Sequence, residues 1–347
     1  MHRRPRAALA RLAALTLAAG PLACAPPIAG TPYPSAEPPA GEVATPGGVR
    51  YFERTIDLEP LLRGFPYERF EASLARDRLF FLEKGEGYTL KMLPLEGEGA
   101  GAGEGPLDLG AAVTISDVDW STRSLWRVHL PKAGSTLWLH ADARNDEQMN
   151  LWALDLESKA LRQVTDHDYV YGFGFSPDEA TIAYLPRSGK KAPFKACLRL
   201  LDVKSGEGRD VLCDSPELSY TWSTPRFSPD GREVYFNALV GGDRNHKVLV
   251  AATLGEGGKA PELRRITEDS GRSTLSALLV RDNAPPQIYI ANDDGYANLY
   301  AHDRTTRENR RLTRLREDIR GAALLGAGIF AVSGTPAGST LSLVDPK

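Results

Sequence analysis

The sequence predicts an all-β protein, a six-bladed β-propeller of four-stranded antiparallel blades, with seven blades as the alternative. A repeated strand carries this prediction: Asn-Leu-Trp-Ala-Leu-Asp at 150–155 and Asn-Leu-Tyr-Ala-His-Asp at 298–303. In both copies a threonine follows ten residues after the aspartate. The positions that correspond to this threonine are Thr165, Leu212, Thr267 and Thr313. They lie 46 to 55 residues apart, and such a period of short strands is typical of propeller blades.

A second pattern supports the same period. Ser-Pro-Asp occurs at 176–178 and Ser-Pro-Asp-Gly at 228–231, and each precedes a stretch rich in β-branched and aromatic residues. Proline presets φ, aspartate bonds its own backbone and glycine accepts positive φ, so these are turns that lead into strands. Gly172 and Gly174 are expected where an innermost strand is crowded near the axis, because they have no side chain.

These anchors divide the chain into six blades. The last blade has room for only three strands and ends at 341–345. The segment Val49–Ile56 precedes the first blade, and we expect it to supply the missing outer strand and close the ring. Closure would remove an open sheet edge; the alternative is a chain cut within a blade. The expected blades are 66–112, 113–166, 167–214, 215–268, 269–315 and 316–347.

The N-terminal region is predicted to lie outside the fold. Residues 1–23 read as a signal peptide, since arginines flank an apolar stretch too short to remain as a membrane helix. The sequence Gly20-Pro-Leu-Ala-Cys24 resembles a lipoprotein cleavage box, so Cys24 is the expected lipidation site, with cleavage without lipid as the alternative. Residues 24–48, rich in Pro, Ala and Gly, are expected to form a disordered tether, and 49–347 a single propeller domain.

Composition limits the class of partner. The chain has 42 basic and 45 acidic residues, and without the four arginines of the signal peptide the acidic excess is larger. It has no basic stripe and no nucleic-acid motif, so we expect no nucleic-acid partner. The 42% apolar content supports one sizeable core. We therefore expect a monomer, in contact with a membrane only through a lipid anchor.

Two cysteines remain besides Cys24. Cys197 and Cys213 fall in neighbouring strands of one blade. A hairpin centred near residue 206 would place Cys213 one step diagonal to Cys197, a geometry that often exceeds the separation a disulfide allows. We therefore expect two buried free thiols, with a disulfide as the alternative.

The sequence contains no catalytic motif that we can identify. A Gly-x-Ser-x-Gly nucleophile elbow does not occur, and the six histidines have no metal-ligand spacing. Two acidic clusters, at 142–147 and 292–294, lack the ordered spacing of a calcium loop. The sequence therefore leans against an enzyme, and we expect no catalytic residue, metal or cofactor.

A partner-binding face can be located from the loops. Loops between the second and third strands share one face with the connections between blades; here they are expected at 83–87, 142–148, 186–195, 238–246, 292–297 and 334–339. Two adjacent loops are rich in cations, and the connections beside them are aromatic. Such a patch fits an anionic or peptidic partner; the alternative is an ordinary solvated surface. The candidate residues are Arg187, Lys190, Lys191, Lys195, Arg244, Tyr171 and Trp222.

These motifs resemble a known group. The Ser-Pro-Asp turns, the Asn-Leu-Trp/Tyr strands and the Arg-x-Leu-Thr endings are similar to TolB-like, WD40-like repeats. Such repeats also form the N-terminal propeller of the prolyl oligopeptidase family, and 54–59 resembles the opening of its bacterial members. The resemblance covers about 50–347. In those peptidases the propeller gates entry to an α/β-hydrolase domain that bears the catalytic serine, aspartate and histidine, and no residue of that domain matches this sequence.

Two functions follow from this reading. The first is a non-catalytic, secreted or lipid-anchored propeller that binds a protein or peptide partner in the bacterial envelope, in the periplasm or at the outer membrane. The second is the substrate-gating half of a prolyl-oligopeptidase-like serine peptidase whose catalytic domain is not in this chain.

Overall fold

The structure is a computed structural model that divides into two units, 1–64 and 65–347, each considered by itself. It describes residues 48–51, 54–57, 66–72, 77–95, 108–132, 134–189, 194–255, 260–267, 274–280, 287–293, 295–325, 328–335 and 338–345. The predicted signal peptide, Cys24 and nearly all of the predicted tether therefore lie outside the described residues. No helix within the described ranges is long and apolar enough to cross a membrane.

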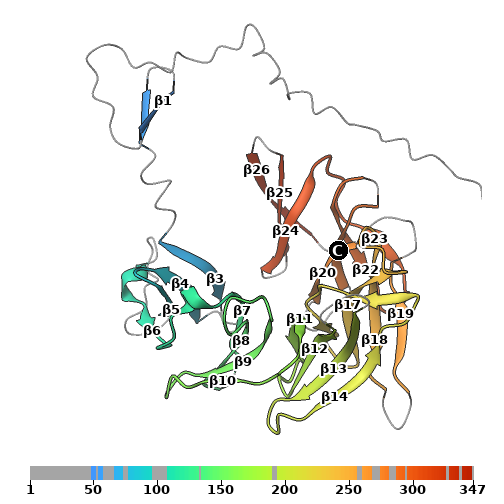
Figure 1. Cartoon of the computed structure of the whole chain (residues 1–347). Helices are drawn as coiled ribbons and strands as arrows, with labels where there is room; N and C mark the ends of the chain where they lie inside the picture. Colours follow the sequence, from blue (N-terminus) through green and yellow to red (C-terminus); the bar gives the residue numbers. More distant parts are fainter. Residues whose placement is uncertain are drawn as a thin grey trace, which may run out of the picture. The chain divides into compact units, whose positions relative to one another are not determined.

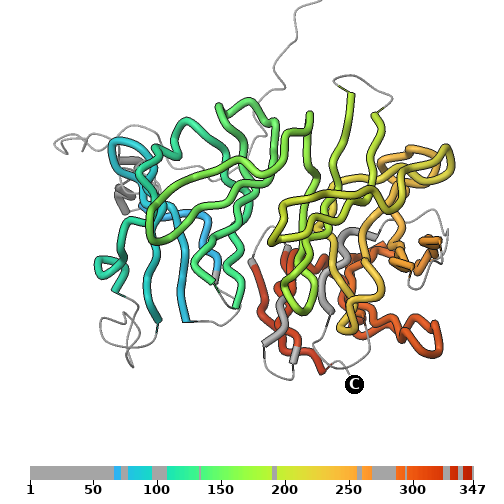
Figure 2. Tube along the Cα trace, turned by 90° about the horizontal axis from the view of Figure 1, so that it is seen from below, coloured from blue at the N-terminus to red at the C-terminus, as the bar shows by residue number. Residues whose placement is uncertain are grey.

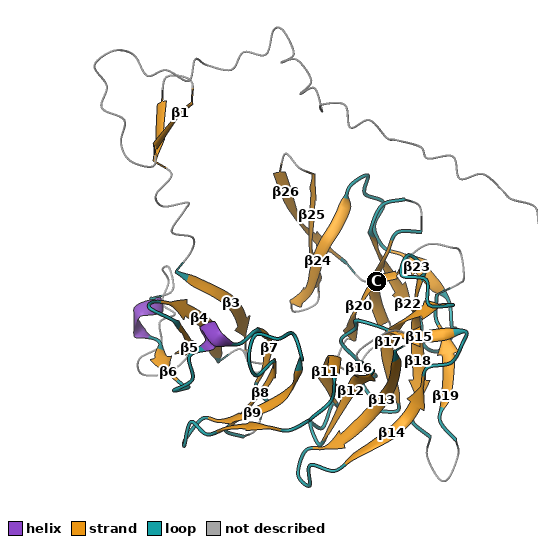
Figure 3. Cartoon of the chain, in the orientation of Figure 1, coloured by secondary structure: helices purple, strands orange, loops and turns teal. Residues whose placement is uncertain are grey.

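The second unit is a six-bladed β-propeller, as predicted (Figure 1). Only two short 3₁₀ helices interrupt the described strands, η1 (Leu109–Ala111) and η2 (Trp120–Thr122) (Figure 3). Blades 1 to 3 contain β3 (Tyr67–Ala72), β4 (Arg78–Lys84), β5 (Tyr88–Pro94) and β6 (Val113–Thr114); β7 (Leu125–His129), β8 (Thr136–Ala141), β9 (Asn150–Asp155) and β10 (Leu161–Gln163); and β11 (Tyr169–Phe175), β12 (Thr181–Ser188), β13 (Lys195–Asp202) and β14 (Gly208–Cys213). Blades 4 to 6 contain β15 (Leu218–Tyr220), β16 (Arg226–Phe227), β17 (Glu233–Val240), β18 (Lys247–Thr253) and β19 (Glu262–Arg265); β20 (Thr274–Val280), β21 (Gln287–Ala291), β22 (Asn298–His302) and β23 (Asn309–Arg311); and β24 (Asp318–Leu325), β25 (Gly328–Thr335) and β26 (Gly338–Val344).

Blades 1, 2, 3, 5 and 6 are antiparallel meanders in which consecutive described strands pair. The first strand of a blade is innermost, and four such strands lie against the first strand of the next blade: β3 contacts β7, β11 contacts β16, β16 contacts β20, and β20 contacts β24. Figure 2 shows this progression from sheet to sheet along the chain. In blade 4 the innermost strand is interrupted, so that β15 and β16 both pair with β17.

Three predictions about the blades can be compared with these strands. Blade 1 ends at β6, two residues later than expected, and the last blade has three described strands, as expected. The segment 49–56 contains two short strands where one strand was predicted. It folds into a hairpin of β1 (Gly48–Tyr51) and β2 (Arg54–Asp57), in which Val49 pairs with Ile56. A short hairpin satisfies these backbone groups locally, with little loop-closure entropy.

The core consists of apolar layers between successive blades. Side chains alternate across a strand, so one strand supplies two layers. In β17, Val234 and Phe236 pack toward blade 3, whereas Tyr235 packs toward blade 5 with Leu249 and Tyr289. The same arrangement joins blades 1 and 2, 2 and 3, and 5 and 6. The near-continuous apolar runs in the second and third strands reflect burial on both faces.

The repeated asparagine and threonine form a buried polar clamp. Asn298 Oδ1 accepts hydrogen bonds from Thr313 Oγ1 and from the Leu315 amide, both at 2.8 Å. Thr313 Oγ1 in turn accepts from the Leu299 amide at 3.0 Å. Asn150 and Thr165 repeat the arrangement in blade 2. The clamp joins the third strand to the end of the fourth, which explains the constant spacing in the sequence.

The Ser-Pro-Asp turns also repeat in detail. Ser176 Oγ donates to Asp178 and accepts from the Thr181 amide at 2.9 Å. Ser228 makes the equivalent bonds to Asp230 and the Glu233 amide. Each serine therefore links the turn to the first residue of the following strand.

Gly172 and Gly174 occupy the crowded position that the sequence predicts. A Cβ at Gly172 would lie 2.3 Å from the Ser223 carbonyl oxygen, and one at Gly174 would lie 2.0 Å from the Pro225 carbonyl oxygen. No side chain fits these gaps, so β11 and the segment leading into β16 approach backbone to backbone.

Candidate functional site

Irregularities in the innermost strands position the side chains of the candidate site. The pairing register shifts between Glu68 and Glu71 in β3, and between Val170 and Phe173 in β11. A similar shift occurs in β7, and β15 and β16 are separated by a break. Bulges bend a strand and redirect its side chains. The first residues that pair again after these irregularities are Glu71, Arg127, Phe173 and Arg226.

Aromatic side chains from blades 2, 3 and 4 meet beside these positions. The rings of Trp126 and Trp222 stack with centroids 4.4 Å apart, although both residues remain exposed, at 41% and 44%. Tyr169 and Tyr171 lie 5.0 and 5.9 Å from the Trp222 ring. We call Trp126, Tyr169, Tyr171 and Trp222 the aromatic rim.

The positively charged guanidinium of Arg187, at the end of β12, lies against this rim. Its guanidinium carbon lies 4.1 Å from the ring centroid of Phe194, 5.0 Å from that of Tyr169 and 5.9 Å from that of Tyr171. Each such contact contributes about 0.5–2 kcal/mol, depending on desolvation. Burial raises the pKa of Tyr171, against the opposing charge of Arg187, so this phenol stays protonated and uncharged near neutral pH. Tyr169 Oη and Arg187 Nε are buried without a hydrogen-bond partner in the described part of the chain.

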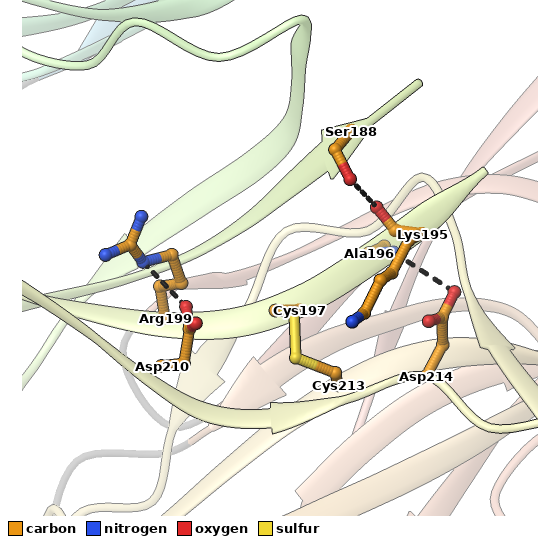
Figure 4. Close-up of a disulfide and its surroundings, with 8 residues drawn as sticks. All are labelled: Ser188, Lys195, Ala196, Cys197, Arg199, Asp210, Cys213 and Asp214. Atoms are coloured by element: carbon orange, nitrogen blue, oxygen red, sulfur yellow. Dashed lines mark hydrogen bonds and ion pairs between the residues drawn. A yellow bond between two sulfur atoms is a disulfide. The ribbon is translucent and has the colours of Figure 1, made fainter. Parts of the chain in front are cut away.

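The structure brings together part of the predicted set. Arg187, Tyr171 and Trp222 belong to one cluster. Arg244 is exposed, and its charge acts on Tyr171. Lys195 is exposed and lies beside Asp214 (Figure 4). Lys190 and Lys191 lie outside the described residues.

A group of charged side chains lies on the innermost strands. Arg127 stacks over the Phe173 ring at 5.4 Å, and its Nη1 donates to the Phe173 carbonyl at 3.0 Å. Burial is the largest influence on Glu71 and raises its pKa, while the charges of Arg127 and Arg226 oppose the shift. Glu71 and Arg226 belong to blades 1 and 4, and the charge of each influences the pKa of the other. We call Glu71, Arg127 and Arg226 the channel group.

Two histidines flank the channel group and remain neutral. Burial, followed by the charges of Arg127 and Arg226, lowers the pKa of His129 to about 3. Burial also lowers the pKa of His140 to about 4, although its Nε2 lies 2.8 Å from the Val170 carbonyl oxygen. The His129 ring stacks on Phe175 at 4.2 Å.

Sequence reasoning missed Trp126 and the whole channel group. A weak signal was present for Arg127 alone, because it lies between Trp126 and Val128 in β7. The Ser-Pro-Asp turn that follows the innermost strand in blades 3 and 4 does not occur in blades 1 and 2, so no alignment of blades placed Glu71 or Arg127 at the level of Arg226.

Cys197 and Cys213 form a disulfide, which corrects the expectation of free thiols (Figure 4). The two residues are paired directly across β13 and β14. The turn is centred nearer residue 205, because Leu201 pairs with Gly208, and Val211 is an unpaired bulge residue. Together, the shifted turn and the bulge place Cys213 directly opposite Cys197. Among the described residues, the one group with metal-ligand geometry is Cys197, Asp210 and Cys213, whose two sulfur atoms are already bonded to each other.

Comparisons with solved structures agree on the fold. A puromycin-hydrolysing peptidase of Mycobacterium tuberculosis superimposes with a TM-score of 0.59 at 16% identity, over 80% of this chain and 45% of that chain. Prolyl oligopeptidase B of Galerina marginata gives a TM-score of 0.59 at 10% identity, over 81% and 43%. The β-propeller domain of the Trilobed protease from Pyrococcus furiosus gives 0.58 at 13% identity, over 85% and 84%.

These similarities define the class of fold. The chain has a six-bladed propeller like the N-terminal propeller of prolyl oligopeptidases, and it spans less than half the length of the two full-length peptidases. No protein-family model matches the chain, and no curated protein matches it.

Proposed function

We propose that this chain is a non-catalytic propeller of the bacterial cell envelope that binds a peptide segment of a partner protein at the aromatic rim and Arg187. The stacked, exposed pair of Trp126 and Trp222 carries the proposal. Tryptophan, tyrosine and arginine are the residues that contribute most often to binding energy at interfaces. A rim that combines all three from three blades is therefore suited to recognition.

The chemistry of the rim fits a peptide. Aromatic faces provide rigid apolar area, at a small loss of conformational entropy. Tyr169 Oη and Arg187 Nε offer buried polar atoms that have no partner among the described residues. The positive charges of Arg187 and Arg244 favour an acidic or carboxylate-bearing segment.

Two features support a location in the envelope. The Cys197–Cys213 disulfide suits an oxidising compartment. The N-terminal sequence suits export and lipidation at Cys24. On this proposal, Cys24→Ala moves the protein from the membrane fraction to the soluble periplasmic fraction. A wild-type protein found in the soluble fraction would reject the lipid anchor.

The binding proposal is tested with peptides. The purified chain is immobilised and exposed to a pool of acetylated random nonapeptides, and the retained peptides are quantified by mass spectrometry. Trp222→Ala should lower retention at least tenfold, because it removes a ring that contacts three others. Tyr296→Ala is the matched control, since Tyr296 is an equally exposed aromatic at 43% in another blade. Equal loss in both variants, or no retention by the wild type, would reject the rim as the binding site.

The comparisons favour a second candidate, the substrate-gating half of a prolyl-oligopeptidase-like serine peptidase. The propeller occupies less than half of the matched full-length peptidases. Sequencing of the gene beyond the codon of Lys347 tests this candidate. A continuing frame that encodes a Gly-x-Ser-x-Gly elbow would establish it, and a stop codon with no adjacent hydrolase gene would remove it.

A further inference from the structure

We infer that the channel group is a carboxylate-binding site, in which Arg127 and Arg226 hold the carboxylate of a peptide whose other residues lie on the aromatic rim. The inference deepens the proposed function and rests on it for the peptide. The site itself is argued from the pairing, charge and space around the two arginines.

Neither arginine forms an ion pair with another described residue. In the part of the chain that the structure describes, Arg127 and Arg226 form no ion pair, and neither does Glu71. Arg127 uses one nitrogen for the Phe173 carbonyl. Arg226 Nε is buried with no hydrogen-bond partner among the described residues. By contrast, Arg264 and Arg304 both form ion pairs with Glu233.

The local charge is unbalanced. The channel group contains two guanidinium groups and one carboxylate, and His129 adds no charge because burial and the two arginines lower its pKa to about 3. Burial, followed by repulsion from Arg127, lowers the pKa of Arg226 to about 9, so it remains charged at neutral pH. A buried charge without a partner is unfavourable. One ligand carboxylate would bring the group to neutrality and could accept charge-assisted hydrogen bonds from a guanidinium.

There is space for such a ligand next to the rim. A cavity of about 240 Å³ is lined by Glu71, Trp126 and Arg127, together with Arg69 and Phe70. Arg226 does not line this cavity but lies beside the same part of β11 as Arg127: a Cβ on Gly174 would be 3.9 Å from the Arg226 amide nitrogen, and Arg127 donates to the neighbouring Phe173 carbonyl. This is the volume of about eight water molecules at ~30 Å³ each. Trp126 belongs to both the cavity and the rim. A peptide on the rim can therefore place a carboxylate in the cavity without leaving the aromatic surface.

The experiment compares three pools of acetylated random nonapeptides on the immobilised chain. The first has free C-terminal acids and no Asp or Glu, the second is the same pool as C-terminal amides, and the third is an amide pool that contains Asp and Glu. We expect the acid pool to be retained at least tenfold more than the matched amide pool. Arg226→Gln and Arg127→Gln should each remove this preference, and Arg226→Lys should keep part of it. Trp222→Ala should weaken all pools by a similar factor.

The outcomes separate the two proposals. If the first and second pools are retained equally and the third pool is retained no better, the carboxylate site is overturned. Binding at the rim would still stand. Preference for the third pool alone would assign the site to a side-chain carboxylate. No retention of any pool would overturn both proposals. If either glutamine variant fails to fold, competition on the wild type decides: acetate should displace the acid pool and acetamide should not, and equal effects would overturn the site.

Discussion

Replacing Gly174 by alanine should force blades 3 and 4 apart. The new Cβ would lie 2.0 Å from the Pro225 carbonyl oxygen, about 1 Å inside the 3.0 Å that real contacts of this kind exceed. Neither backbone segment can move without disturbing strand pairing. Gly174 is paired with Ala183, and Arg226, which follows Pro225, is paired with Tyr235. Overpacking of this kind costs about 1–3 kcal/mol, and a contact between two backbones belongs at the upper end, about 3 kcal/mol.

The assay is equilibrium unfolding in urea, with thermal unfolding as a second measure. A loss of about 3 kcal/mol corresponds to a fall of about 6–12 °C in the unfolding midpoint, using the scale for domains of 150–250 residues. Gly321→Ala is the matched control. Gly321 is also in the innermost strand of a blade, and a Cβ there meets nothing within 4 Å. The control should be neutral or gain up to about 1 kcal/mol, because alanine restricts the unfolded chain.

The result that would refute this reasoning is equally specific. If Gly174→Ala and Gly321→Ala differ by less than about 0.5 kcal/mol, the usual range for harmless substitutions, then β11 and the Pro225 segment do not approach as closely as the structure has them. The same substitution should also weaken binding of carboxylate peptides, because Pro225 directly precedes Arg226.

The other two predictions concern buried polar groups. Asn298→Ala should destabilise the protein by about 2–3 kcal/mol in urea unfolding, since it leaves Thr313 Oγ1 and the Leu315 amide without their acceptor. Asn298→Asp should recover part of the loss because it restores the acceptor, and an unaltered alanine variant would show that the clamp is not stabilising. His140 is neutral in the folded protein down to its pKa of about 4 but is protonated below about 6.5 when unfolded, so the unfolding free energy should fall as pH drops through that window. Each such histidine contributes a slope of about 1.4 kcal/mol per pH unit, and urea unfolding from pH 7 to 4.5 should show a shallower slope for His140→Gln; identical slopes would contradict the burial of this ring.

The predicted blades and turns depended on local chemistry. The Asn298–Thr313 clamp links residues only fifteen apart, and Ser228 bonds a residue two positions away and another five away. Interactions at this range leave a fixed spacing in the sequence. The propeller, its strand order and the loops between second and third strands could therefore be predicted before the structure was known.

The disulfide shows where such reasoning fails. The hairpin between β13 and β14 was expected, but its pairing depended on the centre of the turn and on one unpaired residue, Val211. A bulge leaves no strong mark in a sequence, and a shift of one residue changes which side chains are opposite. The hairpin at 48–57 illustrates the same limit, since strand-forming residues do not specify which edge they pair with.

The fold could be predicted from the sequence because blades are built from short-range patterns that repeat along the chain. The candidate site could not, because its residues come together only in the folded chain. Trp126 and Trp222 are 96 residues apart and Glu71 and Arg226 are 155 apart, yet each pair converges from blades that are not neighbours in the sheet order. Their proximity depends on the curvature of successive blades and on the irregular innermost strands, which no local pattern records.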